Sequence, residues 1–102
     1  MDFKSTVVLD LEREMCKALP VIERVHQEAG ILRGAYITSA RDSIHNVGSL
    51  HPKGLAVDVR TRDLSPTQKG ILTANLQKEL GKDFDVVLET DHIHIEYDPE
   101  VK

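Results

Sequence analysis

The chain has 102 residues, of which 40% are hydrophobic and 29% charged, and it carries a net charge of −4. This composition is typical of one globular domain covering residues 1–102, and the apolar runs are too short for a transmembrane helix. Acidic and basic residues are interspersed, which argues against a surface that binds nucleic-acid phosphates. We therefore expect neither nucleic acid nor a membrane as a partner, and we expect a monomer.

The N-terminal segment lacks the basic leader, continuous apolar stretch and small-residue cleavage site of a secretory signal peptide. The single cysteine, Cys16, cannot form an internal disulfide, which fits synthesis in a reducing compartment. We therefore expect synthesis in the cytoplasm. Action outside the cell would then need another route of release.

The first predicted element is helical. From about residue 8 to residue 29, apolar residues recur at helical spacing, and charged residues fill the opposite face. Pro20 interrupts this pattern, so the segment is either one kinked helix or two helices, with Pro20 in the first turn of the second. Gly30 is a typical residue for the end of the segment.

The remaining predicted elements are four strands and a helix, at 35–39, 55–60, 67–80 (the helix), 84–88 and 92–97. Apolar and polar residues alternate in two of these strands, which places Asp58 and His94 on the faces opposite the core. The last two strands are joined by too few residues for a crossover, so the sheet is expected to be largely antiparallel.

Three side chains have the chemistry and spacing of a zinc site. Catalytic zinc takes three nitrogen, sulfur or carboxylate ligands and leaves a fourth position open. Pro52 favours an extended backbone at His51, and Gly54 allows the chain to turn into the strand of Asp58. If the strands of Asp58 and His94 are neighbours, then His51, Asp58 and His94 can bind one zinc ion.

A further carboxylate lies near these ligands. Asp91 precedes His94 by three residues and could accept the proton of an attacking water molecule. Glu89 and Glu96 are alternatives for this role. Glu96 shares a strand face with His94 and could instead orient its imidazole, whereas Glu89 would need a different turn geometry. A solvated sheet face without function is the structural alternative for the whole group.

A family resemblance is carried by two motifs, Ser49-x-His51-x-x-Gly54-x-Ala56-x-Asp58 and Asp91-x-x-His94. Together they resemble the signature of the zinc peptidases that act on D-alanyl peptides. This group includes D-alanyl-D-alanine carboxypeptidases and dipeptidases and the L-alanyl-D-glutamate endopeptidases of phage lysins, and the Hedgehog signalling domain shares its metal fold. The resemblance extends from about residue 37 to residue 97.

The resemblance implies a role for each matching residue. The implied zinc ligands are His51, Asp58 and His94. Asp91 would be the catalytic acid and base, and His92 would lie close to the reacting centre. Arg41 would hold a carboxylate or a polarised carbonyl of the substrate. Ser49, beside the first ligand, would support the site or contact the substrate.

The expected fold is α+β, with an antiparallel sheet, helices packed on one face and a zinc site on the other. The expected function is hydrolysis of an amide bond next to a D-amino acid in peptidoglycan stem peptides. A phage or prophage enzyme would be made in the bacterial cytoplasm and act on the cell wall after release or as part of a virion. A cytoplasmic D-Ala-D-Ala dipeptidase and a non-catalytic, zinc-stabilised binding or structural module are the alternatives.

Overall fold

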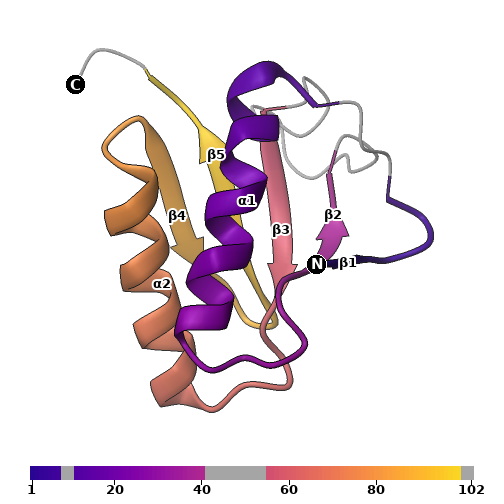
Figure 1. Ribbon diagram of the computed structural model, residues 1–102, viewed down its shortest axis with the longest axis vertical. Helices are drawn as coiled ribbons and strands as arrows, with labels where there is room; N and C mark the ends of the chain where they lie inside the picture. Colours follow the sequence, from indigo (N-terminus) through magenta and orange to yellow (C-terminus); the bar gives the residue numbers. More distant parts are fainter. Residues whose placement is uncertain (8–10, 41–54, 100–102) are drawn as a thin grey trace.

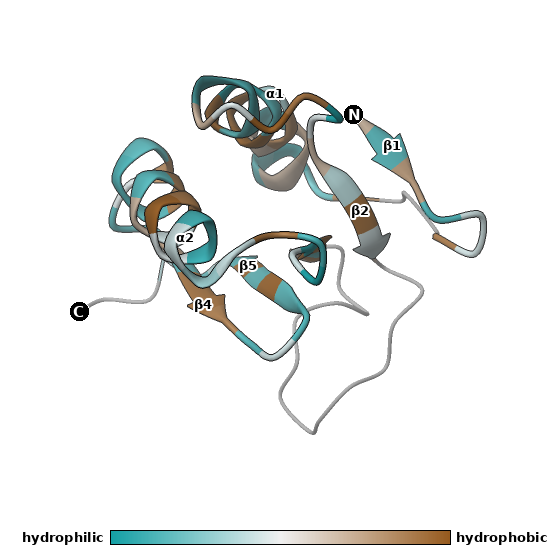
Figure 2. Cartoon of the chain, turned by 90° about the horizontal axis from the view of Figure 1, so that it is seen from below, coloured by the Kyte–Doolittle hydropathy of each residue, from teal (hydrophilic) through white to brown (hydrophobic). Residues whose placement is uncertain are grey.

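The computed structural model describes residues 1–7, 11–40 and 55–99, which form a five-stranded sheet with two helices on one face (Figures 1 and 2). The elements, in chain order, are β1 (Asp2–Phe3), α1 (Arg13–Glu28), β2 (Tyr36–Ser39), β3 (Ala56–Arg60), α2 (Pro66–Leu80), β4 (Phe84–Leu88) and β5 (His92–Tyr97). These elements confirm the predicted α+β class and the packing of the helices on one face of the sheet. Within the described ranges, no helix is both long and apolar enough to span a bilayer.

The sheet is mixed, and this corrects the prediction of an antiparallel sheet. Its strand order is β1-β2-β3-β5-β4, and the pairs β2–β3, β3–β5 and β5–β4 are antiparallel. The additional strand β1 lies parallel to β2, through hydrogen bonds from Asp2 N to Ala35 O and from Lys4 N to Ile37 O, both 2.9 Å. Two residues are too few to show an alternating pattern, so this strand could not be predicted from the sequence.

Helix α1 is continuous through Pro20, which decides between the two predicted arrangements in favour of a single helix. Proline lacks the N–H that would bond to the preceding turn, so it costs helix stability. The compensation comes from packing, because one face of the helix is buried on both sides of the proline. The buried apolar residues of this face are Met15, Ala18, Ile22 and Val25.

Helix α2 begins and ends with strong local signals. Ser65 Oγ accepts a hydrogen bond from Gln68 N, and Gln68 Oε1 accepts one from Ser65 N. Pro66 occupies the first turn. Gly81 follows with φ +90°, a conformation that favours glycine. Leu72 and Leu76 are the buried contacts of the helix with the core.

Hydropathy alternates along β5, which Figure 2 shows as teal and brown bands, and apolar and polar residues also alternate in β3 from Val57 to Arg60. The apolar residues of both strands are fully buried in the core with the helices: Val57, Val59, Ile93 and Ile95. The opposite face carries cross-strand neighbours, since Asp58 pairs with His94 and Arg60 with His92 in the antiparallel register. The strands thus bring polar side chains distant in the sequence to one surface.

Candidate functional site

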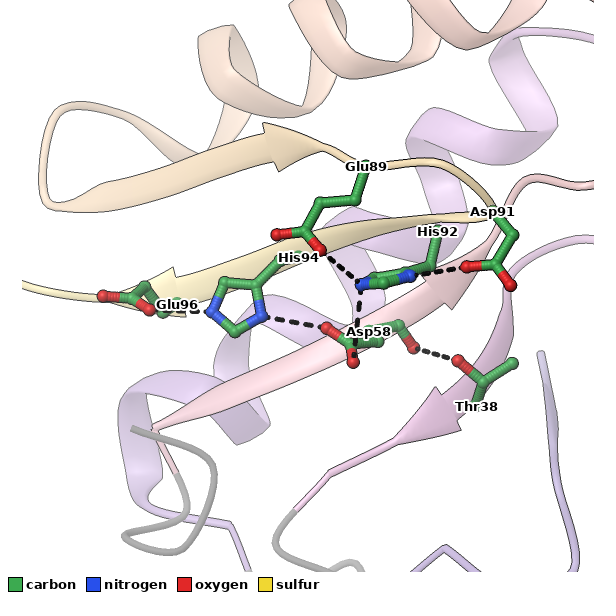
Figure 3. Close-up of polar contacts among 7 residues, drawn as sticks. All are labelled: Thr38, Asp58, Glu89, Asp91, His92, His94 and Glu96. Atoms are coloured by element: carbon green, nitrogen blue, oxygen red, sulfur yellow. Dashed lines mark hydrogen bonds and ion pairs between the residues drawn. The ribbon is translucent and has the colours of Figure 1, made fainter. Parts of the chain in front are cut away.

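Two of the three proposed zinc ligands face each other across neighbouring strands (Figure 3). Asp58 lies in the middle of β3, and His94 is its direct partner on β5. Asp58 Oδ1 is 2.9 Å from His94 Nδ1. The aspartate is only 2% exposed, and a buried carboxylate requires a cationic or hydrogen-bonding partner.

The imidazole of His94 is held between two carboxylates. Its Nδ1 faces Asp58, and its Nε2 lies 2.7 Å from Glu96 Oε1. The hydrogen bond to Asp58, together with that to Glu96, raises the pKa of His94 to about 9, although burial acts in the opposite direction. The metal-free imidazole is therefore protonated at neutral pH, and a metal would have to displace this proton.

Asp58 and His94 suit a zinc ion in donor type and spacing. They supply one carboxylate oxygen and one imidazole nitrogen, 2.9 Å apart. Ligand atoms of a tetrahedral zinc with bonds of about 2.0–2.1 Å lie about 3.3 Å apart, so a small separation of the pair would be enough. Glu96 then bonds the ring nitrogen that faces away from Asp58, which is the usual way a carboxylate fixes a ligating imidazole.

His92 connects this pair to the proposed catalytic carboxylate. Its Nδ1 lies 2.8 Å from Asp91 Oδ1, and its Nε2 lies 3.9 Å from Asp58 Oδ2 (Figure 3). The hydrogen bond with His92 lowers the pKa of Asp91, so this exposed carboxylate is ionised at neutral pH and is a weaker base than an ordinary aspartate. Asp91 is therefore connected to Asp58 through the imidazole of His92.

The alternative base Glu89 also reaches His92. A hydrogen bond of 2.8 Å from Glu89 N to His92 O closes the turn between β4 and β5. Its Oε2 lies 3.1 Å from His92 Nε2, on the opposite side of the ring from Asp91. The turn thus brings Glu89 to His92, which the sequence alone did not show. Glu89 and Asp91 both stay candidates for the base.

Three proposed site residues lie outside the described residues. They are the first zinc ligand, the proposed substrate clamp and the serine beside the ligand: His51, Arg41 and Ser49. Their predicted roles stay predictions, and of the three proposed ligands the structure brings together Asp58 and His94.

A cluster of carboxylates lies on the same sheet and was missed in the sequence. Oxygens of Asp85, Glu96 and Asp98 lie within 4.8 Å of one another. Asp85 and Glu96 are cross-strand partners of β4 and β5, a register that no sequence pattern specifies. Oxygen-only clusters suit calcium or magnesium rather than zinc, and acidic groups gather on surfaces without any ion. The cluster therefore offers a second group of carboxylates against which zinc binding by Asp58 and His94 can be compared.

Comparison of the chain with protein-family models, with curated proteins and with solved structures found no match. The resemblance to zinc peptidases therefore rests on the two sequence motifs.

Proposed function

We propose that this protein is a zinc-dependent peptidase that hydrolyses an amide bond next to a D-amino acid in peptidoglycan stem peptides. The observation that carries the proposal is the buried cross-strand pair of Asp58 and His94, linked through His92 to the ionised Asp91. The substrate class comes from the sequence resemblance. It favours a phage or prophage enzyme that degrades the cell wall.

The metal would be held by Asp58 and His94 together with His51. When bound, zinc supplies Lewis acidity, which polarises the scissile carbonyl and lowers the pKa of a water molecule. Asp91 accepts the proton of the attacking water and donates it to the leaving amine. His92 Nδ1, 2.8 Å from Asp91 Oδ1, orients this carboxylate.

The test uses the full chain loaded with zinc and incubated with purified peptidoglycan. Mass spectrometry should detect new amino and carboxyl termini beside a D-amino acid. Asp91→Asn should slow their formation by about 100- to 10,000-fold, the usual contribution of a general base, and should leave the bound zinc unchanged. The control is Asp83→Asn, which removes an exposed carboxylate at the other end of β4.

Metal analysis of two further variants tests the ligands. Asp58→Asn should lose the zinc, whereas Asp85→Asn, in the carboxylate cluster, should keep it. Retention of zinc by Asp58→Asn would contradict the proposed site. Stoichiometric zinc without any cleavage of peptidoglycan or of D-Ala-D-Ala would contradict the peptidase and favour the zinc-stabilised module.

A further inference from the structure

A polar pocket lies beside the proposed catalytic residues. Its volume is about 150 Å³, and it is lined by Lys4, Thr38, Arg60, Arg62, Asp91 and His92. Pockets that enclose a whole small ligand measure about 300–1,000 Å³, so this one fits a single group of a larger ligand. Asp91 and His92 belong both to the pocket and to the proposed catalytic machinery, as Figure 3 shows for the contact between them.

The pocket is positively charged. Three cations and one carboxylate leave the lining with two positive charges in excess when His92 is counted as neutral, although the whole chain is acidic. The carboxylate of Asp91 is already bonded to His92. Positive charge gathered in a concave surface attracts an anion more strongly than the same charges spread over a convex one.

The three cations form no ion pair with a carboxylate of the described residues, unlike Arg24 and Arg33. Arg33 forms two hydrogen bonds with Asp63, and Arg24 bonds both Glu28 and Glu79. Lys4 and Arg62 are also exposed, so a ligand can reach them. Arg62 lies close enough to Asp91 to help lower the pKa of that carboxyl.

Arg60 is held by an aromatic neighbour, since its guanidinium carbon lies over the Tyr36 ring, 4.0 Å from the ring centre. The guanidinium group is planar, and its N–H groups match the two oxygens of a carboxylate. Thr38, on the neighbouring strand, adds a hydroxyl to the same pocket.

The pocket also has a fixed position relative to the proposed zinc ligands. Arg60 is the cross-strand partner of His92, as Asp58 is of His94, so Arg60 lies two residues from Asp58 on the same strand face. His92 Nε2 is 3.9 Å from Asp58 Oδ2. A hydrogen bond from Thr61 N to Asp91 O fixes the β4–β5 turn against the end of β3. Only the imidazole of His92 would thus lie between Asp58 and a group bound in the pocket.

We infer that this pocket, formed by Lys4, Arg60 and Arg62 beside Asp91 and His92, binds a carboxylate of the substrate and so helps to select the bond that is cut. The inference rests on the proposed function for the identity of the substrate. Stem peptides offer two such groups, the α-carboxylate of a γ-linked D-glutamate and the terminal carboxylate of D-alanine. Both have the same chemistry, and the experiment separates them.

The experiment measures kcat and KM for a synthetic pentapeptide, L-Ala-γ-D-Glu-L-Lys-D-Ala-D-Ala, in three forms. One form has both carboxylates free, one is amidated at the D-glutamate α-carboxylate, and one at the C-terminus. Amidation of the bound carboxylate should raise KM about tenfold, the usual effect of a charged hydrogen bond. Arg62→Gln should raise KM for the free form to a similar extent, with little change in kcat, and should not affect the form already amidated at that group.

The matched control is Arg24→Gln, which removes the same charge from helix α1 outside the pocket and should leave all KM values unchanged. Lys4→Gln is the second pocket variant. Arg62 and Lys4 are exposed, so neither change disturbs the core. Equal KM values for all three peptides, or equal effects of Arg62→Gln and Arg24→Gln, would overturn the inference while leaving the peptidase intact.

A binding measurement keeps the pocket testable without catalysis. N-acetyl-D-alanine, titrated into the full chain, should shift the NMR amide signals of Lys4, Arg60 and Arg62, and N-acetyl-D-alaninamide should not. The shifts should disappear in Arg62→Gln. Specific shifts without peptide cleavage would support the carboxylate pocket and contradict the peptidase. Equal shifts by acid and amide, or none with either, would overturn the pocket.

Discussion

The two faces of the central sheet use the same strands for different purposes. On the helix-covered face, the side chains of β3 and β5 have no exposed surface and form the core: Val57, Val59, Ile93 and Ile95. On the other face, the intervening residues carry the contacts of the proposed site. Because side chains alternate along a strand, stability and chemistry are separated by a single residue. Substitutions on the two faces should therefore have separable effects.

The largest effect on stability is expected on the helix-covered face. Ile95→Ala removes a fully buried side chain that lies between Val57 and Val86 in the sheet, and it should lower the free energy of unfolding by about 2–5 kcal/mol. Val87→Ala, on the polar face of the edge strand and 48% exposed, is the control and should cost less than about 1 kcal/mol. Urea unfolding of the metal-free protein measures both. Similar losses would show that the helix-covered face does not dominate stability.

The next effect comes from the polar face and depends on pH. The pKa of His94 is raised from 6.5 to about 9 by Asp58 and Glu96, so between these pH values the folded protein binds more protons than the unfolded chain. The resulting stabilisation is complete below pH 6.5 and is lost as the pH rises through 9. We expect the metal-free protein to lose on the order of 2–3 kcal/mol over this range.

Urea unfolding in the presence of a chelator, repeated from pH 6 to pH 10, measures this loss. Asp58→Asn should flatten the profile, since the amide does not attract the proton of His94. Zinc-loaded protein should show the opposite trend up to about pH 9, because zinc binding requires the deprotonated imidazole. A flat profile for the metal-free parent protein would show that the contacts of His94 on the polar face do not contribute to stability.

The smallest effect is expected on zinc affinity, at a residue that contacts a proposed ligand without being one. Glu96→Gln weakens the carboxylate contact to His94 Nε2 and should lower zinc affinity about 10- to 100-fold. Asp98→Asn changes the same carboxylate cluster without a described contact to His94 and should leave the affinity unchanged. Competition with a fluorescent chelator measures both affinities. Equal losses would indicate that the cluster, rather than the Asp58–His94 pair, binds the metal.

The sequence predicted the two faces of β3 and β5 because their alternation extends over five or six residues. It could not predict β1, whose two residues have no pattern, or the continuity of α1 through Pro20, which depends on packing on both sides of the proline. Local preferences are weak compared with such tertiary contacts.

The charged pocket was missed for a related reason. Lys4 and Arg60 are far apart in the chain, and only the strand order brings them together. One signal was available, since Arg60 follows Asp58 by two residues and therefore shares its strand face. The contact of Glu89 with His92 had no such signal, because it depends on the conformation of the β4–β5 turn.

Strand β1 has a disproportionate influence for its length. It joins the sheet through a few backbone hydrogen bonds at the edge and places Lys4 directly after it, at the rim of the pocket. The helices and the four longer strands hold the buried core without Asp2, Phe3 or Lys4. If the pocket selects the substrate as proposed, loss of residues 1–4 would change selectivity by removing Lys4. It would also remove the packing of Met1 against the core and the contact of the Met1 amino group with Glu23, so stability would fall with it.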